Sequence, residues 1–470
     1  MKKMLMALSL SGALLGGSAM VWAEDAASTP VAEQTVAASD TVAASTVTVA
    51  AEAPAPVEAA PAPAPVAKVD TGDTAWILVS TALVLLMTIP GLALFYGGMV
   101  RKKNVLSTMM FSLSAAILVS LIWVIAGYSL AFSGSGAYVG DFAKVMLNGV
   151  AFDALSGTIP ESLFVIFQMT FAIITVAIIS GSIADRMKYS AFMAFIAVWI
   201  VLVYAPITHW VWAADGWLFK AGALDFAGGT VVHINAGVAG LVAAYMLGKR
   251  AGLGRESMAP HNLTLTVIGA SLIWVGWFGF NGGSALGAGA RASMAILVTQ
   301  VAAAAAAFSW LIVERLVRGK ASVLGGASGA VAGLVVITPA AGFVGVGGAL
   351  IMGLIGGVVC FWGITALKRL LKADDALDAF GLHAVGGIVG AVLTGVFYSN
   401  EIIKAANVAL APTFAGQLWV QVEGVLATMV YSAVVTFIIL KVIDLVIGIR
   451  VSADDERMGL DLSQHGERIE

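Results

Sequence analysis

The 470-residue chain is far more apolar than a soluble protein. Hydrophobic residues make up 60% of it, charged residues make up 11%, and the mean hydropathy is +0.95, whereas a soluble domain carries about 25% charged residues. The net charge of -3 leaves no basic excess for binding nucleic acid. The single cysteine, Cys360, excludes an intrachain disulfide and a thiolate metal cluster. The composition therefore predicts a polytopic membrane protein without redox chemistry.

The first 72 residues are expected to lie outside the membrane domain. Two lysines precede an apolar stretch, and small residues precede a cleavage point after Ala23, so residues 1–23 are predicted to be a secretory signal peptide. Residues 24–72 contain 16 Ala, 6 Pro and no aromatic residue, a composition that cannot bury a core. We expect an extended, disordered tether there, and nothing in its residues specifies a partner.

Eleven apolar runs follow, each near the length of about 20 residues that crosses about 30 Å of hydrocarbon. They predict an all-α polytopic membrane protein with eleven transmembrane helices, the last of which is long enough to require strong tilt. The predicted spans are 75–96, 105–132, 163–184, 189–212, 226–248, 262–281, 294–317, 322–341, 345–367, 380–398 and 416–449.

The positions of Lys and Arg predict the orientation of these spans. An odd number of spans behind a cleaved signal places the mature amino terminus outside and the carboxyl terminus in the cytoplasm. Lys and Arg concentrate in the segments that this arrangement puts inside, as the positive-inside rule requires. The predicted outer loops hold only Lys144, Lys220, Arg291 and Lys404. Residues 73–450 are thus the predicted transmembrane domain, and residues 451–470 the cytoplasmic tail.

Two short patterns recur and indicate an internal repeat. The first span ends in GLALFYGG (91–98) and the sixth in GWFGFNGG (276–283). The fifth and tenth spans share His-x-x-[Ala/Gly]-Gly-x-x-Gly, beginning at His233 and His383. Spans 1–5 therefore correspond to spans 6–10, and five spans per half require the halves to lie inverted in the membrane. In inverted repeats of transporters the site lies between the halves near the midplane.

His233 and His383 are the only histidines that fall deep inside predicted spans. A single histidine within a span is most often a packing residue. Two imidazoles at equivalent positions of an inverted repeat converge on the pseudo-two-fold axis, however, where they can line a pore and share a proton. Two histidines with few acids nearby do not suffice for zinc, and the sequence has no hydrolase nucleophile. We predict no metal, no cofactor and no enzymatic activity.

An acidic residue and several aromatic residues lie close to these histidines in the predicted spans. Asp225 opens the fifth span, where its expected role is to accept hydrogen bonds from the free amides of the helix start. Trp210 and Trp212 end the fourth span, where tryptophan usually anchors a helix at the membrane interface. Aromatic faces also bind cations. Further aromatic residues lie in the third span (Phe167 and Phe171) and in the sixth (Phe278 and Phe280). Ser284 offers a hydroxyl just after the sixth span.

At these residues the sequence resembles the ammonium transporter (Amt), methylammonium permease and Rhesus family. The resemblance extends over about residues 73–467, and DFAGGTVVHINAG (225–237) is its most specific motif. The other motifs that carry it are IPGLALFYGGMVRKKN (89–104), GWFGFNGGSA (276–285), FGLHAVGGIVG (380–390) and GLDLSQHGE (459–467).

The resemblance implies a homotrimer of eleven-span subunits in the bacterial inner membrane, each with its own pore. By motif position, Phe171, Trp212 and Ser284 would recruit ammonium or methylammonium, and Phe171 with Phe280 would form a gate. His233 and His383 would line the pore or relay protons, with Asp225 in a supporting role. The resemblance also implies that the tail couples to a PII-type signal protein under nitrogen regulation.

Energy favours deprotonation of ammonium before passage. Moving a bare cation into a low-dielectric medium costs on the order of 20 kcal/mol, which three aromatic faces at about 2 kcal/mol each do not offset. We therefore expect neutral ammonia to cross, with or without a proton relay along the histidines. The alternatives are an ammonium sensor that conducts little, and a Rhesus-like gas channel for carbon dioxide.

Overall fold

The computed structural model of the protein describes residues 68–469. The predicted signal peptide and most of the predicted tether lie outside the described residues. The first helix, α2 (Thr71–Leu86), begins within the segment predicted to be tether, because Asp70 caps it by accepting the Asp73 amide at 2.9 Å. The first apolar helix therefore starts two residues before residue 73, the predicted beginning of the transmembrane domain.

Eleven apolar helices in chain order form the described part of the chain, as the sequence predicts. Ten are long and apolar enough to cross a membrane, and the eighth, α13, is a shorter apolar helix. The spans are α2 (Thr71–Leu86) with η1 (Met87–Leu92) and α3 (Ala93–Met99); η2 (Lys102–Asn104) with α4 (Val105–Ile122), η3 (Trp123–Gly127) and α5 (Tyr128–Phe132); α6 (Glu161–Ile183); α7 (Tyr189–Trp199) with η5 (Ile200–Tyr204) and α8 (Ala205–Trp212); η6 (Gly229–Ile234) with α10 (Asn235–Leu247); α11 (Leu263–Gly283); α12 (Ala290–Arg318); α13 (Val323–Ile337); α14 (Val346–Trp362) with η7 (Gly363–Leu367) and α15 (Lys368–Leu371); η8 (Phe380–Ala384) with α16 (Val385–Phe397); and α18 (Phe414–Val446).

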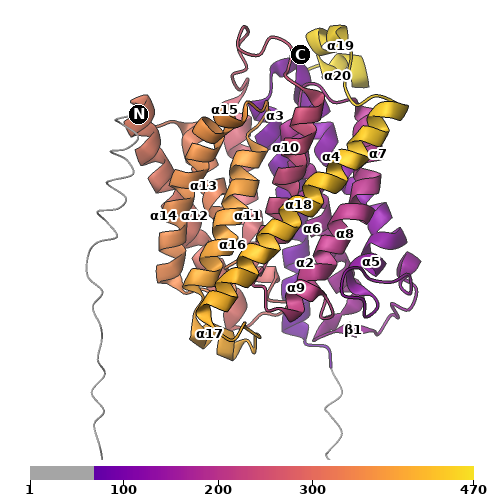
Figure 1. Ribbon diagram of the computed structural model, residues 1–470, viewed down its shortest axis with the longest axis vertical. Helices are drawn as coiled ribbons and strands as arrows, with labels where there is room; N and C mark the ends of the chain where they lie inside the picture. The colour runs from indigo at the N-terminus through magenta and orange to yellow at the C-terminus, as the bar shows by residue number, and fades with distance from the viewer. Residues whose placement is uncertain (1–67, 470) are drawn as a thin grey trace, which may run out of the picture. The chain divides into compact units, whose positions relative to one another are not determined.

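Short elements occupy the connections and the tail. They are η4 (Val145–Leu147), the two-residue antiparallel strands β1 (Leu155–Ser156) and β2 (Ile159–Pro160), α9 (Trp217–Lys220), α17 (Asn400–Ala405), α19 (Ala453–Met458) and α20 (Leu460–His465). We call the end of the membrane domain that carries α19 and α20 the C-terminal face, and the end that carries β1 and α17 the opposite face (Figure 1).

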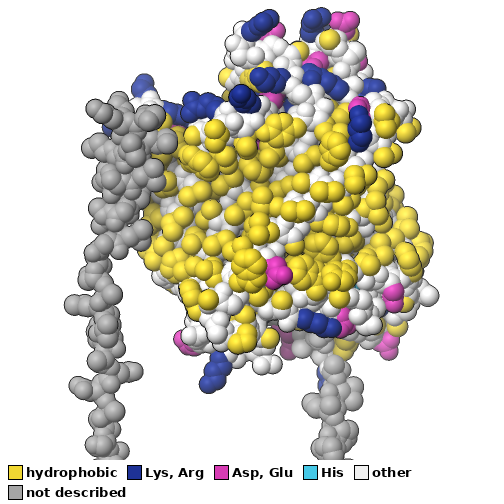
Figure 2. Space-filling model, viewed as in Figure 1, with side chains coloured by type: hydrophobic (Ala, Val, Ile, Leu, Met, Phe, Trp, Pro, Cys, Tyr) yellow, Lys and Arg dark blue, Asp and Glu magenta, His cyan; other side chains and the backbone are white. Residues whose placement is uncertain are grey.

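The side chains on the surface separate these two faces by an apolar band. Figure 2 shows Lys and Arg gathered at the C-terminal face above a broad band of hydrophobic side chains. Helix α18 crosses this band obliquely, as the prediction of strong tilt requires, and packs against α7, α10 and α16 (Figure 1).

The equivalent spans of the two halves pack on each other. Helices α2 and α3 contact α11, so the first span lies against the sixth. Likewise α10 contacts η8 and α16 contacts η6, so the fifth span lies against the tenth. The repeated glycines permit this approach, because a Cβ on Gly237 would lie 2.5 Å from the Ala384 nitrogen and one on Gly387 would lie 2.7 Å from the Gly229 oxygen. Small residues thus allow the close backbone packing that helices in lipid rely on.

Candidate functional site

A cavity of about 450 Å³ opens toward the opposite face and is lined by three of the predicted site residues. Trp212 is the last residue of α8, Phe171 lies in the middle of α6, and Ser284 is the residue that caps the carboxyl end of α11. Sequence positions far apart in the chain therefore converge on one cavity, as the motif positions imply.

Hydrogen bonds to backbone oxygens fix two of these three side chains. The Trp212 indole Nε1 donates to the Asp225 carbonyl at 2.8 Å, and its ring meets Phe171 edge-on with centroids 5.7 Å apart. The Ser284 hydroxyl donates to the Phe280 carbonyl at 2.8 Å. Because its one proton is used there, the Ser284 oxygen can only accept a hydrogen bond from a molecule in the cavity.

Two stacked phenyl rings close the inner end of the cavity. The Phe171 and Phe280 centroids are 4.3 Å apart with 27° between the planes, and both rings are buried. Phe280 also lies 6.0 Å from the His233 ring. Phe171 and Phe280 therefore belong to a series of ring contacts that runs from Trp212 to His233, at the two positions for which the family resemblance implies a gate.

His233 and His383 face each other directly behind this pair of rings. Their Nδ1 atoms are 3.2 Å apart and their ring centroids 5.2 Å apart. When one Nδ1 donates, the other must accept, so the two neutral rings hold complementary tautomers. His233 Nε2 is buried without a hydrogen-bond partner among residues 68–469. This nitrogen can therefore form a hydrogen bond with a small polar molecule placed beside it.

A narrow apolar space lies beside His383. It holds about 10 Å³ and is lined by aliphatic side chains together with Phe95, Trp277 and His383. This volume is close to the minimum that accommodates one water-sized molecule. Trp277, which the sequence analysis did not single out, stacks on His233 at 5.3 Å and donates its Nε1 to the Thr338 hydroxyl at 2.9 Å.

A carboxylate organises the chain ahead of His233. Asp225 accepts the amides of four successive residues from Gly228 to Val231, at 2.6 to 3.1 Å. This is the capping role expected of Asp225, extended to the whole first turn of η6.

The second half repeats the arrangement, which the sequence analysis missed. Asp375 accepts the amides of Ala379 and Phe380 at 3.2 and 2.8 Å and the Ser182 hydroxyl at 2.7 Å. Each aspartate precedes its histidine by eight residues, and each histidine lies in a π-helical turn, η6 or η8. The Asp-x7-His spacing common to both halves was the signal that would have identified Asp375.

Two aromatic residues considered in the sequence lie away from this column of side chains. The Trp210 indole donates to the Tyr138 carbonyl at 2.6 Å and packs on Tyr431, so it holds the loop that contains Tyr138. Phe278 is half-buried and lines none of the cavities described above. Across residues 68–469, no three His, Cys, Asp or Glu side chains converge as a metal site would require.

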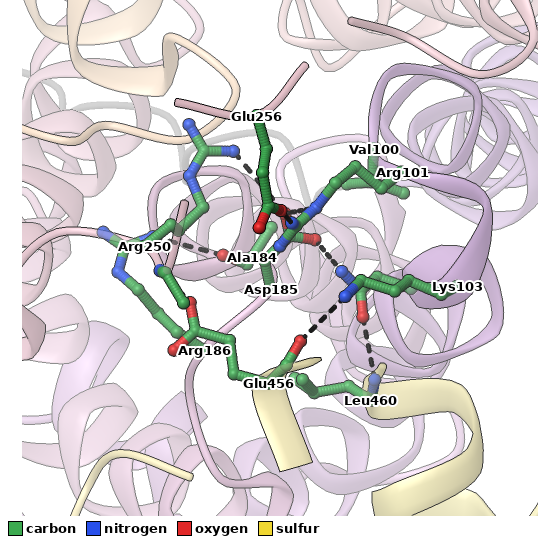
Figure 3. A network of polar contacts seen from close by, with 12 residues as sticks. Val100, Arg101, Lys103, Ala184, Asp185, Arg186, Arg250, Glu256, Glu456 and Leu460 are labelled. Carbon is green, nitrogen blue, oxygen red and sulfur yellow. Dashed lines mark hydrogen bonds and ion pairs between the residues drawn. The ribbon is translucent and has the colours of Figure 1, made fainter. Parts of the chain in front are cut away.

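The C-terminal face holds a second cluster of polar groups (Figure 3). Buried Asp185 accepts from Arg101 Nε at 3.1 Å and lies 3.6 Å from Arg250 Nη1. Glu456 of α19 accepts the Ala251 amide at 2.6 Å and Arg450 Nη2 at 2.8 Å. The tail thus contacts the loops between spans.

The tail also caps the second span. Asp461 accepts the amides of Leu106 and Ser107 at 3.0 and 2.8 Å, at the start of α4. The Leu460 amide donates to the Asn104 side-chain oxygen at 2.8 Å. A carboxylate at a helix amino terminus is stabilised by the free amides and the helix dipole.

Comparison with known proteins identifies the family. The family model described as the Ammonium Transporter Family matches residues 75–469. The chain belongs to the ammonium transporter family. An ammonium transporter of Bacillus subtilis is 51% identical over 399 residues, which cover 84% of this chain and 98% of the relative. The ammonium transporter Amt1 of Archaeoglobus fulgidus is 45% identical over 399 residues, covering 84% of this chain and 98% of that protein.

Solved structures agree with this family assignment. The structure of Saccharomyces cerevisiae Mep2 matches with a TM-score of 0.77 at 36% identity, covering 82% of this chain and 88% of that one. A structure titled as a sensor Amt protein matches with a TM-score of 0.78 at 29% identity, covering 84% and 98%. This ammonium transporter is therefore a multi-pass membrane protein of a transporter family, with ammonium as its substrate.

Proposed function

We propose that this transporter recruits the ammonium ion in a cup formed by Trp212, Phe171 and Ser284, and passes ammonia through a pore lined by His233 and His383. The observation that carries this proposal is the unbroken column of side chains. The cavity, the stacked phenyl rings, the histidine pair and the narrow apolar space follow one another in direct contact.

The chemistry of the cup suits a small cation that can donate hydrogen bonds. Two aromatic faces attract the positive charge, each by about 2 kcal/mol where water is excluded. The Ser284 oxygen can accept one N–H from the ion, because its own proton is engaged with Phe280. A potassium ion is attracted by the same aromatic faces and by the same oxygen, but it has no proton to lose, so it is rejected at the next step and not in the cup.

Beyond the phenyl gate the surroundings oppose charge. The narrow space is almost entirely aliphatic and aromatic, and a bare cation pays on the order of 20 kcal/mol of Born energy there. The ion therefore loses a proton at or before Phe171 and Phe280. Ammonia then crosses as a neutral molecule, donating to or accepting from the histidine pair.

The proton has two routes, and both fit the geometry. It returns to the outer solution, which gives net ammonia flux, or it passes between the Nδ1 atoms of the two histidines, which gives net ammonium transport. Current evoked by ammonium in proteoliposomes distinguishes the routes, because only the second is electrogenic.

The decisive experiment uses a histidine variant and selectivity. His233→Ala removes the imidazole and leaves a space in the column large enough for water to enter, and we expect it to admit potassium that the wild type excludes. His261→Ala is the matched control, because His261 contacts the Val100 carbonyl away from the column. A His233→Ala protein that still excludes potassium while transporting ammonium would contradict the neutral-ammonia mechanism.

We further propose the assembly and placement that accompany this function. A signal peptide at residues 1–23 directs the chain to the bacterial inner membrane, with the mature amino terminus outside and the C-terminal face in the cytoplasm. The Lys and Arg side chains at that face support this orientation (Figure 2). Three copies form a homotrimer in the lipid bilayer, and each copy contains its own pore.

The docked tail supports regulation at the cytoplasmic face. We infer that α19 and α20 hold the inner loops in a conformation to which a PII-type signal protein binds when nitrogen is sufficient. Deleting residues 451–470 should abolish inhibition by such a protein while leaving ammonium uptake in its absence. Inhibition that survives the deletion would exclude this role of the tail.

A further inference from the structure

One cationic side chain lines the cavity in which we place ammonium recruitment. Arg291, in the first turn of α12, shares this cavity with Trp212, Phe171 and Ser284. It is the only Lys or Arg among the residues that line it, and Asp225 is the only carboxylate. A positive charge in a site for a cation is unexpected, because like charges repel across a cavity with low-dielectric walls.

The guanidinium is held in place on three sides. Its carbon lies 4.8 Å from the Phe226 ring centre and 5.0 Å from that of Phe343. Nε donates to the Gly342 carbonyl at 3.1 Å. The Phe226 and Phe343 rings together form an aromatic shelf under the guanidinium. A Cβ at Gly342 would lie 2.1 Å from the Phe226 ring, so only a residue without a side chain leaves room for this shelf. The positive charge of Arg291 therefore has a fixed position in the cavity.

Arg291 has no carboxylate as an ion-pair partner within residues 68–469. Its two Nη atoms make no hydrogen bond in that part of the chain. Both oxygens of Asp225 are engaged by the four amides of η6. Aromatic faces stabilise the guanidinium without cancelling its positive field.

A fixed positive charge has different effects on the charged and neutral forms of the substrate. It raises the free energy of ammonium in the cavity and leaves that of ammonia unchanged, so it favours release of the proton. It also acts on a divalent cation with twice the strength that it has on a monovalent one, since the Coulomb energy scales with the charge. The aromatic cup counteracts it by attracting the cation.

We propose that Arg291 is a specificity-determining residue for transport. Its charge weakens cation binding in the recruitment cavity, promotes deprotonation of the bound ammonium, and opposes divalent cations most strongly. This inference rests on the proposed recruitment site. It adds that the cavity balances aromatic attraction against a built-in repulsion, so that the ion is not held too tightly to release its proton.

The test compares charge removal with charge retention in proteoliposomes. Arg291→Met keeps a long apolar stem on the aromatic shelf without the charge, and Arg291→Lys keeps the charge. For Arg291→Met we expect the KM for methylammonium uptake to fall roughly three- to tenfold, as removal of one like charge across such a cavity implies, and the maximal rate to fall. We expect Mg²⁺ to inhibit this variant at a several-fold lower concentration than it inhibits the wild type.

Arg291→Lys should remain close to the wild type in its KM for methylammonium and in its sensitivity to Mg²⁺. Lys404→Gln is the control for loss of an outer positive charge, because Lys404 is exposed and does not line the cavity; it should change neither KM nor Mg²⁺ sensitivity. Equal KM and equal Mg²⁺ inhibition for Arg291→Met and the wild type would overturn the inference while leaving the recruitment site intact.

A measurement on the wild type needs no variant to fold. At equal ionic strength, Mg²⁺ should compete with methylammonium uptake no better than K⁺ does. Stronger competition by Mg²⁺ would show a net negative cavity and overturn the role of Arg291. Failure of the recruitment proposal is distinguishable, because methylammonium uptake would then be insensitive to Trp212 and Ser284 substitutions.

Discussion

At the scale of single residues, the recruitment cup depends on hydrogen bonds that orient apolar surfaces. The Trp212 ring owes its position to a bond from its indole nitrogen to the Asp225 carbonyl, and Ser284 becomes a pure acceptor through its bond to the Phe280 carbonyl. In each case a main-chain oxygen removes a competing donor from the cavity. Trp212, Phe171 and Ser284 therefore present the ion with aromatic faces and an acceptor oxygen, and with no competing N–H or O–H donor of their own.

Replacing Trp212 tests this arrangement. Trp212→Leu keeps an apolar side chain but removes one aromatic face, which contributes about 2 kcal/mol to a desolvated cation. The KM for methylammonium should rise roughly tenfold or more, since about 1.4 kcal/mol corresponds to tenfold in an equilibrium constant. Uptake kinetics in proteoliposomes measure the change.

Trp210→Leu is the matched control for the Trp212 substitution. Trp210 lies two residues earlier on the same helix but bonds the Tyr138 carbonyl and packs on Tyr431. The Trp210→Leu substitution should lower the thermal unfolding midpoint without raising the KM for methylammonium. If both variants raised KM equally, the effect would be a general loosening of α8 and not the loss of a cation site.

At the scale of elements, the two histidine-bearing spans start in the same way. A carboxylate eight residues ahead of each histidine binds the amides at the start of a π-helical turn, η6 or η8. These carboxylates satisfy amides that would otherwise be buried without partners, and they complement the helix dipole. The inverted repeat therefore applies to the device that positions each imidazole as well as to the imidazole itself.

Neutralising these caps should lower stability in a predictable order. Asp225→Asn affects four amides and Asp375→Asn affects two amides and a hydroxyl. Removing a helix cap typically costs about 1 kcal/mol, and more where the group is buried. We expect both variants to unfold at lower temperature in detergent, with the larger loss for Asp225→Asn.

The exposed Asp153 supplies the control for cap removal. Asp153→Asn removes an exposed carboxylate next to β1 without uncapping a helix, so its unfolding midpoint should match the wild type. An equal shift in all three variants would assign the effect to net charge, and the reverse order of the two cap variants would contradict the hydrogen-bond argument.

The spans and the histidine pair could be predicted from the sequence because they leave local signals. Hydropathy runs give the span limits to within a few residues, and repeated His-x-x-[Ala/Gly]-Gly-x-x-Gly patterns place His233 and His383 on one axis. The roles of Trp277 and Arg291 left no such signal. Trp277 resembles any buried aromatic residue of a span, and the Arg291 shelf requires Phe226 and Phe343, which come together only through tertiary packing.

At the scale of the whole molecule, buried charges join the loops of the C-terminal face. Arg250 bonds Asp374 through its main-chain amide, Nε and Nη2, so the loop after the fifth span is fastened to the loop before the tenth. Arg186 donates to the Gly248 and Asp374 carbonyls, which adds the loop after the third span. The loops of both halves are therefore linked at this face through Asp374.

This linkage predicts a loss of stability in acid. Burial raises the pKa of Asp374, but the hydrogen bonds and positive charge of Arg250 outweigh burial and hold that pKa below its ordinary value. A group with a depressed pKa in the folded state contributes stability above its unfolded pKa, which is about 3.9, and loses the contribution as pH falls through its folded pKa. The temperature at the midpoint of thermal unfolding should therefore decrease when the pH falls below about 4.

Arg250→Gln isolates this part of the acid response. It leaves the Asp374 carboxylate buried without its cation, so the midpoint at neutral pH should fall. The drop below about pH 4 should also shrink, since protonating an unpaired carboxylate no longer breaks an ion pair. Thermal scans between pH 3 and 7, taken as approximate limits around the carboxyl pKa, measure both effects. An unchanged acid limb in the variant would assign the response to other carboxylates.

The tail is attached to these loops by one buried carboxylate. Glu456 accepts the Ala251 amide and Arg450 Nη2, and its side chain is 1% exposed. Glu456→Ala removes both contacts and leaves the Ala251 amide without its acceptor, at a cost of about 1 to 3 kcal/mol, whereas Arg450 Nη2 keeps its bond to the Lys249 carbonyl. We expect α19 and α20 to detach more often, so that their amides exchange with deuterium faster while the spans exchange as in the wild type. The matched control is Asp454→Ala, because the Asp454 side chain is 88% exposed and, within residues 68–469, its ion pair is with Arg457 three residues later. The tail of this variant should remain as protected as in the wild type. Equal protection of the tail in the wild type and Glu456→Ala would mean that Asp461 and Leu460, bonded to the start of the second span, suffice to dock it.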